Sequence, residues 1–151
     1  MNLGFRLVRL KVGKKAKIYS IQYDGEENHE FHKFITKPEV YNHHDYQALR
    51  KKIKELYDKR GLLPQYFRSE DELFTHPEIC RIDYGIGYLR LYCIRWNENL
   101  LILGGGSVKP GDIRFWQENH ELSVEARKVA DVFHRLVGYL KETGLAIEDL
   151  L

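Results

Sequence analysis

Arginine and lysine side chains are interleaved with aromatic and apolar residues across positions 79 to 115 of this 151-residue chain. The cations of this stretch are Arg81, Arg90, Arg95, Lys109 and Arg114. Arginine binds phosphate through a planar fork of donors and does not lose its charge. A sheet that presents such cations beside tyrosine and tryptophan is suited to hold a polyanion, and we expect that polyanion to be RNA.

Metal-free RNA cleavage is the chemistry that these residues could support. The 2′-OH of the substrate attacks the adjacent phosphorus, so the enzyme must orient the groups, move two protons and stabilise the phosphorane charge. The cations Arg81, Arg90, Lys109 and Arg114 are candidates for holding the phosphate. His120 is a candidate general base because imidazole titrates near neutral pH. A plain polar residue before the last helix is the alternative interpretation of His120.

Side chains of the predicted strand 87–96 alternate between two faces. One face carries Arg90, Tyr92, Ile94 and Trp96, and the other carries Leu89, Leu91, Cys93 and Arg95. We expect the leucine face to pack on the core. Arg90 and Tyr92 would then point outward, where Tyr92 could stack on a base. The alternative is an ordinary solvent-facing arginine on an antiparallel sheet.

Neither a metal nor a small-molecule cofactor is predicted. His29, His32, His43 and His44 lack an appropriately spaced acidic or cysteine ligand. The glycines at 104–106 have no phosphate-loop spacing and are interpreted as a strand-end bend that allows close approach. Cys80 and Cys93 are interpreted as buried thiols.

Hydrophobic periodicity and turn residues predict one α+β domain over residues 1–151. The predicted elements are a β-hairpin at 4–23, a helical hairpin at 26–60, a sheet at 79–104 and a C-terminal helix at 122–142. Within the helical hairpin, Pro38 should end the first helix and Gly61 the second. The expected architecture is an antiparallel, twisted sheet of about four to five strands, with an N-terminal helical hairpin and the C-terminal helix packed on it.

Basic residues cover the polar side of the predicted helix 45–60, and Lys51 and Lys54 are candidates for RNA contact. The same side could be an ordinary solvated helix face, or the hairpin could receive a segment of a partner protein.

A net charge of +2 neither requires nor excludes nucleic acid. No apolar run approaches the roughly 20 residues that span a bilayer, and the N-terminus lacks a signal-peptide core, so we expect a cytoplasmic protein without a membrane partner.

The helical hairpin, the strand ICRIDYG and the hairpin YLRLYCIRWNENLLILGGGSVKPG together resemble the RelE/ParE superfamily of bacterial toxins, in its HigB-like or phage-derived branch. The resemblance covers roughly residues 16–140. It implies that Arg90 is the central strand arginine, Lys109 the lysine after the last apolar strand, and Arg81 a basic site residue. It also implies a later aromatic, which Phe115 or Trp116 could supply for RNA binding. Pro110 and Asp83 depart from the family pattern, since basic residues are frequent at both places.

The resemblance implies a metal-independent endoribonuclease, or mRNA interferase, that cleaves mRNA in association with the ribosome. Its implied partners are mRNA, the ribosome and a cognate antitoxin protein that neutralises it. Two alternatives stay open because of Pro110 and Asp83: a non-enzymatic inhibitor of DNA gyrase, and an inactive module that only binds an antitoxin.

Overall fold

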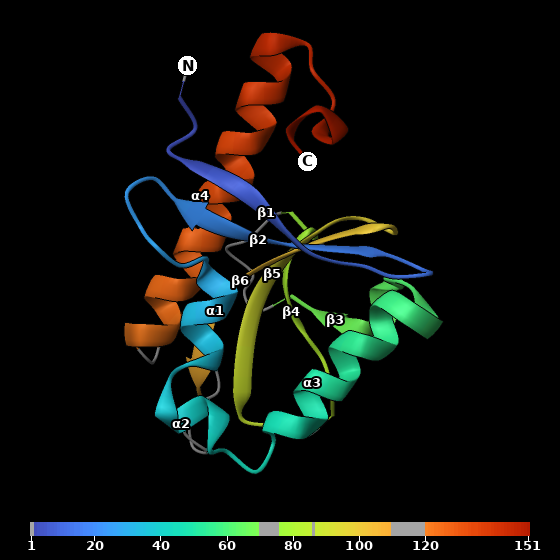
Figure 1. Cartoon of the computed structure of the whole chain (residues 1–151), viewed down its shortest axis with the longest axis vertical. Coiled ribbons are helices and arrows are strands. Elements are labelled where there is room, and N and C mark those ends of the chain that lie inside the picture. Colours follow the sequence, from blue (N-terminus) through green and yellow to red (C-terminus); the bar gives the residue numbers. More distant parts are fainter. Residues whose placement is uncertain (1, 70–75, 86, 110–119) are drawn as a thin grey trace.

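A six-stranded sheet in the order β1-β2-β6-β5-β4-β3 forms the centre of the molecule (Figure 1). The computed structural model describes residues 2–69, 76–85, 87–109 and 120–151. The strands are β1 (Phe5–Val12), β2 (Lys17–Tyr23), β3 (Phe67–Arg68), β4 (Ile79–Ile82), β5 (Leu89–Asn97) and β6 (Leu100–Val108). The helices are α1 (Glu30–Ile35), α2 (Pro38–Tyr41), α3 (Tyr46–Glu55) and α4 (His120–Thr143), with the short turns η1 (Leu56–Arg60), η2 (Pro64–Tyr66) and η4 (Ile147–Leu150).

The predicted architecture was wrong in its sheet and in its N-terminal part. The sheet has six strands and is mixed, because β2 runs parallel to β6 while the other neighbours are antiparallel. The chain begins with the strands β1 and β2, in the region of the predicted β-hairpin, and the helices α1 to α3 come after them, so the helical part is not N-terminal. Side-chain alternation reveals a strand and its faces, but it does not reveal which distant strand will lie beside it or in which direction. The N-terminal hairpin therefore joined the sheet at a place that the local pattern could not show.

Both faces of the sheet are buried. Under α4 lies one apolar cluster, which includes Tyr19, Ile21, Tyr92, Ile94 and Ile102 from the strands. The opposite cluster lies under α1, α2 and α3 and includes Ile18, Leu89, Leu91, Cys93 and Leu103. Helices on both faces explain why β5 is buried from Leu89 to Ile94 and β6 from Leu100 to Ser107, instead of at every second position.

Proline and glycine set the helix boundaries. Ile35 ends α1, and Pro38 begins the separate short helix α2, so the predicted stop before Pro38 is confirmed. The predicted helix 45–60 consists of α3 followed by the π-helical turn η1, and Gly61 ends it with φ of 77°. At the C-terminus of α4, Gly144 has φ of 73° in the left-handed region that favours glycine.

The glycines of β6 lie inside the strand, which continues to Val108 instead of ending at residue 104. A Cβ atom added to Gly104 would lie 2.4 Å from Cγ2 of Val129 on α4. A Cβ atom added to Gly106 would lie 1.8 Å from the carbonyl oxygen of Arg90. Absent side chains at these positions let α4 and the β5 backbone approach β6 closely, in agreement with the predicted close approach.

Cys80 and Cys93 are paired across β4 and β5 as buried free thiols, with 3.8 Å between their sulfur atoms. None of the described helices combines the length and the apolar character needed to cross a lipid bilayer.

Candidate functional site

Arg81, Arg90 and Tyr92 gather on the face of the sheet that α4 covers. Arg81 on β4 pairs in register with Tyr92 on β5, and Arg90 lies two residues before Tyr92 on the same face. Arg90 is 8% exposed and Tyr92 is 2% exposed, while Arg81 is half-buried. We call these three residues the Arg81–Arg90–Tyr92 cluster.

The predicted outward orientation of Arg90 and Tyr92 was wrong. The split of β5 into two faces was right, but α4 packs on the face that was expected to meet solvent. The apolar stripe of α4, which includes Val129 and Phe133, is buried against the sheet. Tyr92 and Ile94 form part of the sheet surface that it covers. Tyr92 is therefore a core residue with a polar end, and its ring is not an exposed platform for stacking a base.

A hydrogen-bonded loop before β5 positions Arg90. One guanidinium nitrogen of Arg90, Nη1, donates to the carbonyl oxygen of Gly87 at 2.6 Å. Asp45, just before α3, accepts bonds from the backbone N–H of Tyr88 at 2.8 Å and from the hydroxyl of Tyr84 at 3.2 Å. That hydroxyl also accepts the N–H of the first β5 residue at 2.8 Å. Asp45 thus ties α3 to the segment that holds the Arg90 side chain.

Two like charges lie close together in this cluster. Burial, together with the positive charge of Arg90, lowers the pKa of Arg81 to about 10. Burial also lowers the pKa of Arg90. Both guanidinium groups remain charged at neutral pH. The carboxylate of Asp83 acts on both of them and that of Asp45 on Arg90, and a bound anion would add to this stabilisation.

The hydroxyl of Tyr92 is buried and has no hydrogen-bond partner among the described residues. Burial raises the pKa of Tyr92, although Arg90 and Arg81 act in the opposite direction. The hydroxyl is therefore neutral at physiological pH and available as a donor. Together, the cluster offers two cations and one hydroxyl donor, which is a set of groups that suits an oxyanion.

Glu125 brings a carboxyl group to the same face from α4. Its Oε2 would lie 2.3 Å from a Cβ atom placed on Gly105, so the carboxyl rests directly on β6. Burial raises the pKa of Glu125, against the opposing charges of Lys128 and Lys37. The charge of Glu125 also contributes to the raised pKa of Tyr92. A carboxyl whose pKa is raised by burial is a candidate for proton transfer.

Glu125 was not among the predicted site residues. A signal was present, since Glu125 lies three residues after Leu122 and four before Val129, inside the buried stripe. A charged residue within such a stripe is rare unless it has a partner or a role.

Side chains cover the outer edge of β6 beside this site. The paired part of β2 and β6 ends at Ser20 and Leu103, and none of the described strands pairs with the rest of β6 on that side. Ser20 Oγ donates to the carbonyl oxygen of Leu103 at 2.8 Å and accepts the N–H of Phe31 at 3.0 Å. Lys37 Nζ donates to the carbonyl oxygen of Gly106 at 2.7 Å and bonds the Glu121 carboxylate at 2.9 Å. The last contact ties α2 to the first turn of α4.

The other predicted site residues are distributed differently. Lys109 is half-buried just past β6, and its N–H donates to the carbonyl oxygen of Tyr88 at 2.6 Å, so its backbone lies at the Arg90 end of the sheet. His120 is exposed at the first position of α4. Lys51 and Lys54 are exposed on α3, which packs on the opposite face of the sheet, so they do not join the cluster. Arg114 and Trp116 lie outside the described residues.

A second polar group consists of His43, His44 and Asp45, whose possible ligand atoms lie within 4.8 Å of one another. The sequence prediction overlooked Asp45 as an acidic neighbour of these histidines. His43 Nδ1 accepts the N–H of Asp45 at 3.0 Å, and the Asp45 carboxylate already accepts the bonds from Tyr84 and Tyr88. The group therefore has an internal hydrogen-bonding role in holding the loop before β5.

No family model, no curated protein and no solved structure matches the chain. Its function is therefore inferred from the geometry of its own residues and from the resemblance carried by its motifs.

Proposed function

We propose that this chain is a RelE-like toxin that binds mRNA at the Arg81–Arg90–Tyr92 cluster and cleaves it without a metal ion, in association with the ribosome. A cognate antitoxin protein would neutralise it, and its mRNA substrate would place its activity in the cytoplasm. One observation carries the proposal: two partly buried guanidinium groups gather on one face of the sheet with a buried hydroxyl that has no partner among the described residues. Such a set favours an anionic ligand over an apolar one.

The proposed reaction is an attack of the RNA 2′-OH on the adjacent phosphorus, with loss of the 5′ oxygen. The products are a 2′,3′-cyclic phosphate and a free 5′-OH. Arg81 and Arg90 would stabilise the negative charge of the phosphorane, and the Tyr92 hydroxyl would donate a hydrogen bond to one of its oxygens. Glu125 would accept the proton of the 2′-OH, and Lys109 or His120 would return a proton to the leaving oxygen.

Access to the cluster requires a movement of α4. Arg90 and Tyr92 are almost completely covered, and contacts between Lys37 and Glu121 and between Lys128 and Glu30 hold the beginning of α4. The Lys37–Glu121 pair is largely exposed and contributes about 0 to 1 kcal/mol, so binding of RNA could open the first turn of the helix, while Lys128 keeps its pair with the buried Glu30.

Cleavage of RNA by the purified protein tests this proposal, with chelator present and with and without ribosomes. We expect cleavage in the chelator, cyclic-phosphate ends, and growth arrest when the chain is expressed in bacteria. Replacement of Arg81 and Arg90 by alanine should abolish both effects, while Arg9→Ala on the exposed side of β1 should abolish neither. Circular dichroism would show that the variants fold. Full toxicity of a folded double variant would rule out this site.

Burial of Arg90 and Tyr92 favours a second candidate, a non-enzymatic inhibitor that binds a protein such as DNA gyrase. A DNA supercoiling assay separates the two candidates. Accumulation of relaxed plasmid with intact mRNA would support the inhibitor, and cleaved mRNA with normal supercoiling would support the ribonuclease. An inactive antitoxin-binding module would give neither effect.

A further inference from the structure

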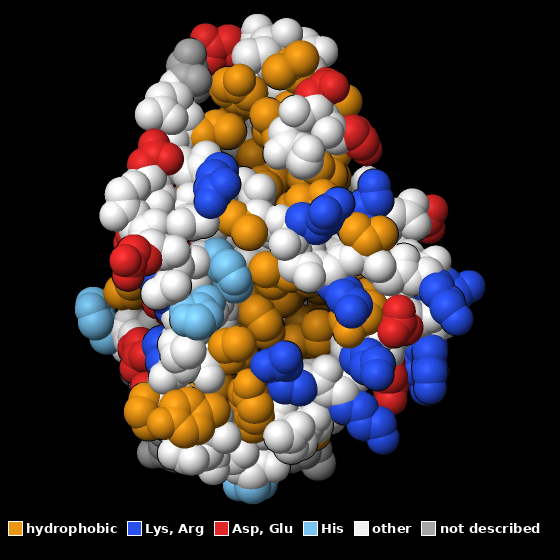
Figure 2. All heavy atoms as spheres, viewed as in Figure 1, with side chains coloured by type: hydrophobic (Ala, Val, Ile, Leu, Met, Phe, Trp, Pro, Cys, Tyr) orange, Lys and Arg blue, Asp and Glu red, His pale blue; other side chains and the backbone are white. Residues whose placement is uncertain are grey.

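A basic groove lies on the face of the sheet opposite the Arg81–Arg90–Tyr92 cluster. It is a cavity of about 530 Å³ between α1 and α3, and we call it the α1–α3 groove. Its floor is apolar and is formed by Ile18, Phe31, Ile53 and Leu103. Lys11, Arg50, Lys51 and Lys54 line it with positive charge. Figure 2 shows this arrangement as a hollow with hydrophobic side chains at its base and basic side chains around it.

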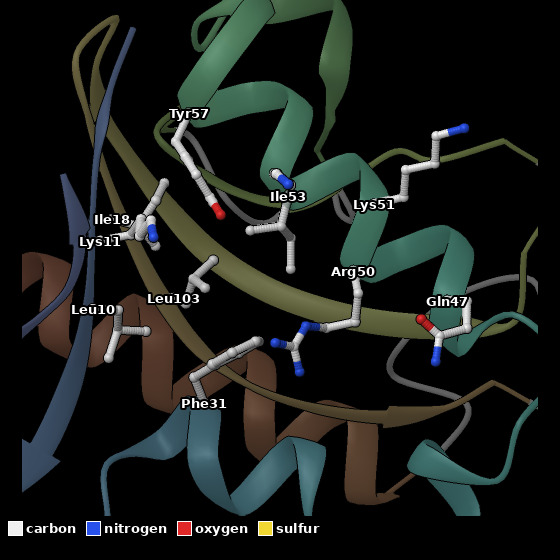
Figure 3. Close-up of a pocket in the computed structure, with 11 residues that line it drawn as sticks. Leu10, Lys11, Ile18, Phe31, Gln47, Arg50, Lys51, Ile53, Tyr57 and Leu103 are labelled. Carbon is white, nitrogen blue, oxygen red and sulfur yellow. The ribbon is translucent and has the colours of Figure 1, made fainter. Parts of the chain in front are cut away.

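Two cations lie over aromatic rings across the groove. The Arg50 guanidinium, which reaches from α3, lies 5.7 Å from the ring centre of Phe31 on α1 (Figure 3). Lys11 Nζ on β1 lies 5.8 Å from the ring centre of Tyr57 in η1. These contacts hold positive charge over the apolar floor instead of letting it extend freely into solvent.

A β-bulge in β1 brings an apolar and a charged side chain to the groove side by side. The register between β1 and β2 shifts between Arg9 and Lys11, so Leu10 is the extra residue. A regular strand would send Leu10 and Lys11 to opposite faces, but a bulge redirects its side chains, and both line the groove. The groove therefore presents adjacent apolar and cationic contacts, which match adjacent aliphatic and carboxylate groups.

We infer that the α1–α3 groove binds an acidic amphipathic segment of a partner protein. Aliphatic side chains of that segment would enter over Ile18 and Leu103, and its carboxylates would pair with Lys11 and Arg50. This surface is separate from the Arg81–Arg90–Tyr92 cluster, and the inference holds whether or not the chain cleaves RNA.

The floor favours a polypeptide over RNA. Aliphatic groups such as Ile18, Ile53 and Leu103 do not form hydrogen bonds with base edges or with the 2′-OH, which RNA recognition uses. The Phe31 and Tyr57 rings, which could stack on bases, each have a cation over one face. Cations alone would suit either a phosphate or a carboxylate, so the apolar floor decides between them.

Selection from a displayed library of random peptides on the purified full chain tests the inference. We expect enriched peptides to combine several Asp or Glu residues with Leu, Ile or Val. A synthetic copy of the best peptide should bind in fluorescence anisotropy and weaken as salt increases. Enrichment of peptides without this pattern, or no enrichment, would overturn the inference.

Matched charge reversals locate the site. The double variant Lys11→Glu/Arg50→Glu should bind the selected peptide about tenfold or more weakly, since two contacts change from attraction to repulsion. The control Lys59→Glu/Lys141→Glu has the same net charge but changes exposed residues that do not line the groove, and it should bind as the unchanged chain does. Equal loss in both variants would show nonspecific attraction and would contradict the assignment.

A short single-stranded RNA provides the competing ligand. If the groove binds a polypeptide, Lys11→Glu/Arg50→Glu should leave RNA affinity close to that of the control variant. Displacement of the peptide by the RNA, together with RNA binding that the groove variant alone loses, would make this surface an RNA site and would overturn the inference.

Discussion

Replacement of Tyr92 by phenylalanine should make this protein more stable and less active. The Tyr92 hydroxyl is buried with no hydrogen-bond partner among the described residues. An unsatisfied buried polar group costs about 1 to 3 kcal/mol, and its removal recovers that free energy. The missing oxygen leaves a void of roughly 10 to 15 Å³, which at about 24 cal/mol per Å³ costs about 0.3 kcal/mol. We therefore expect the free energy of unfolding to increase by about 1 kcal/mol or more.

Urea denaturation followed by tryptophan fluorescence measures this change. The midpoint should increase with an unchanged slope, and the melting temperature should increase by about 2 to 4 °C for each kcal/mol in a chain of this size. Tyr84→Phe is the matched control, because the Tyr84 hydroxyl bonds Asp45 and the N–H of Leu89. Loss of these bonds should reduce the free energy of unfolding by about 1 to 2 kcal/mol.

The two phenylalanine variants should thus change stability in opposite directions. If Tyr92→Phe is destabilised as much as Tyr84→Phe, the Tyr92 hydroxyl has a partner in the folded protein and our reasoning is wrong. If Tyr92→Phe is stabilised and cleaves RNA as fast as the unchanged chain, the hydroxyl has no part in the proposed reaction. Higher stability with slower cleavage would show a group that is retained for function at a cost in stability.

Three further predictions concern the packing and charge around β6. Gly104→Ala should lower the free energy of unfolding by about 1 to 3 kcal/mol, because its Cβ would lie 2.4 Å from Val129; chemical denaturation measures this. Ser20→Ala should cost about 1 to 3 kcal/mol by the same measurement, because two buried bonds lose their partner. Burial raises the pKa of Glu125 in the folded protein. Ionisation of this carboxyl therefore lowers the free energy of unfolding once the pH rises above the pKa that Glu125 has in the unfolded chain. Glu125→Gln should therefore be more stable than the unchanged chain at neutral pH, and this advantage should disappear below about pH 4, as denaturation across a pH series would show.

The sequence was sufficient to predict most elements but not the surroundings of Arg90. Apolar spacing placed the long helices within a few residues, and alternation assigned Leu89, Leu91 and Cys93 to one core. Arg90 itself was expected to be exposed, because an arginine beside leucines on a strand is typical of a solvent face. Tyr92 and Ile94 on the same face were the sign that a second layer covers it.

Contacts between distant segments could not be predicted from local patterns. Lys37 and Glu121 are separated by 84 positions, and no periodicity relates them. The parallel pairing of β2 with β6 could not be predicted either, since it depends on where the intervening segments bring the chain back to the sheet. Glu125 is an intermediate case, because its place in an apolar stripe was visible although its neighbours were not.

The pairing of β2 with β6 also has a consequence for the order in which the protein folds. Strands β5 and β6 are joined by a short turn, whereas the bond from Ser20 to Leu103 closes a loop of 83 positions. Loop closure of this length is costly in entropy, so we expect the β5–β6 hairpin to form early and the β1–β2 hairpin to dock late. In stopped-flow experiments, Ser20→Ala should then accelerate unfolding and leave the folding rate almost unchanged. A slower folding rate would instead place the docking of β2 in the rate-limiting step. During synthesis, the N-terminal hairpin would have to wait for β6 to leave the ribosome before it gains its place in the sheet.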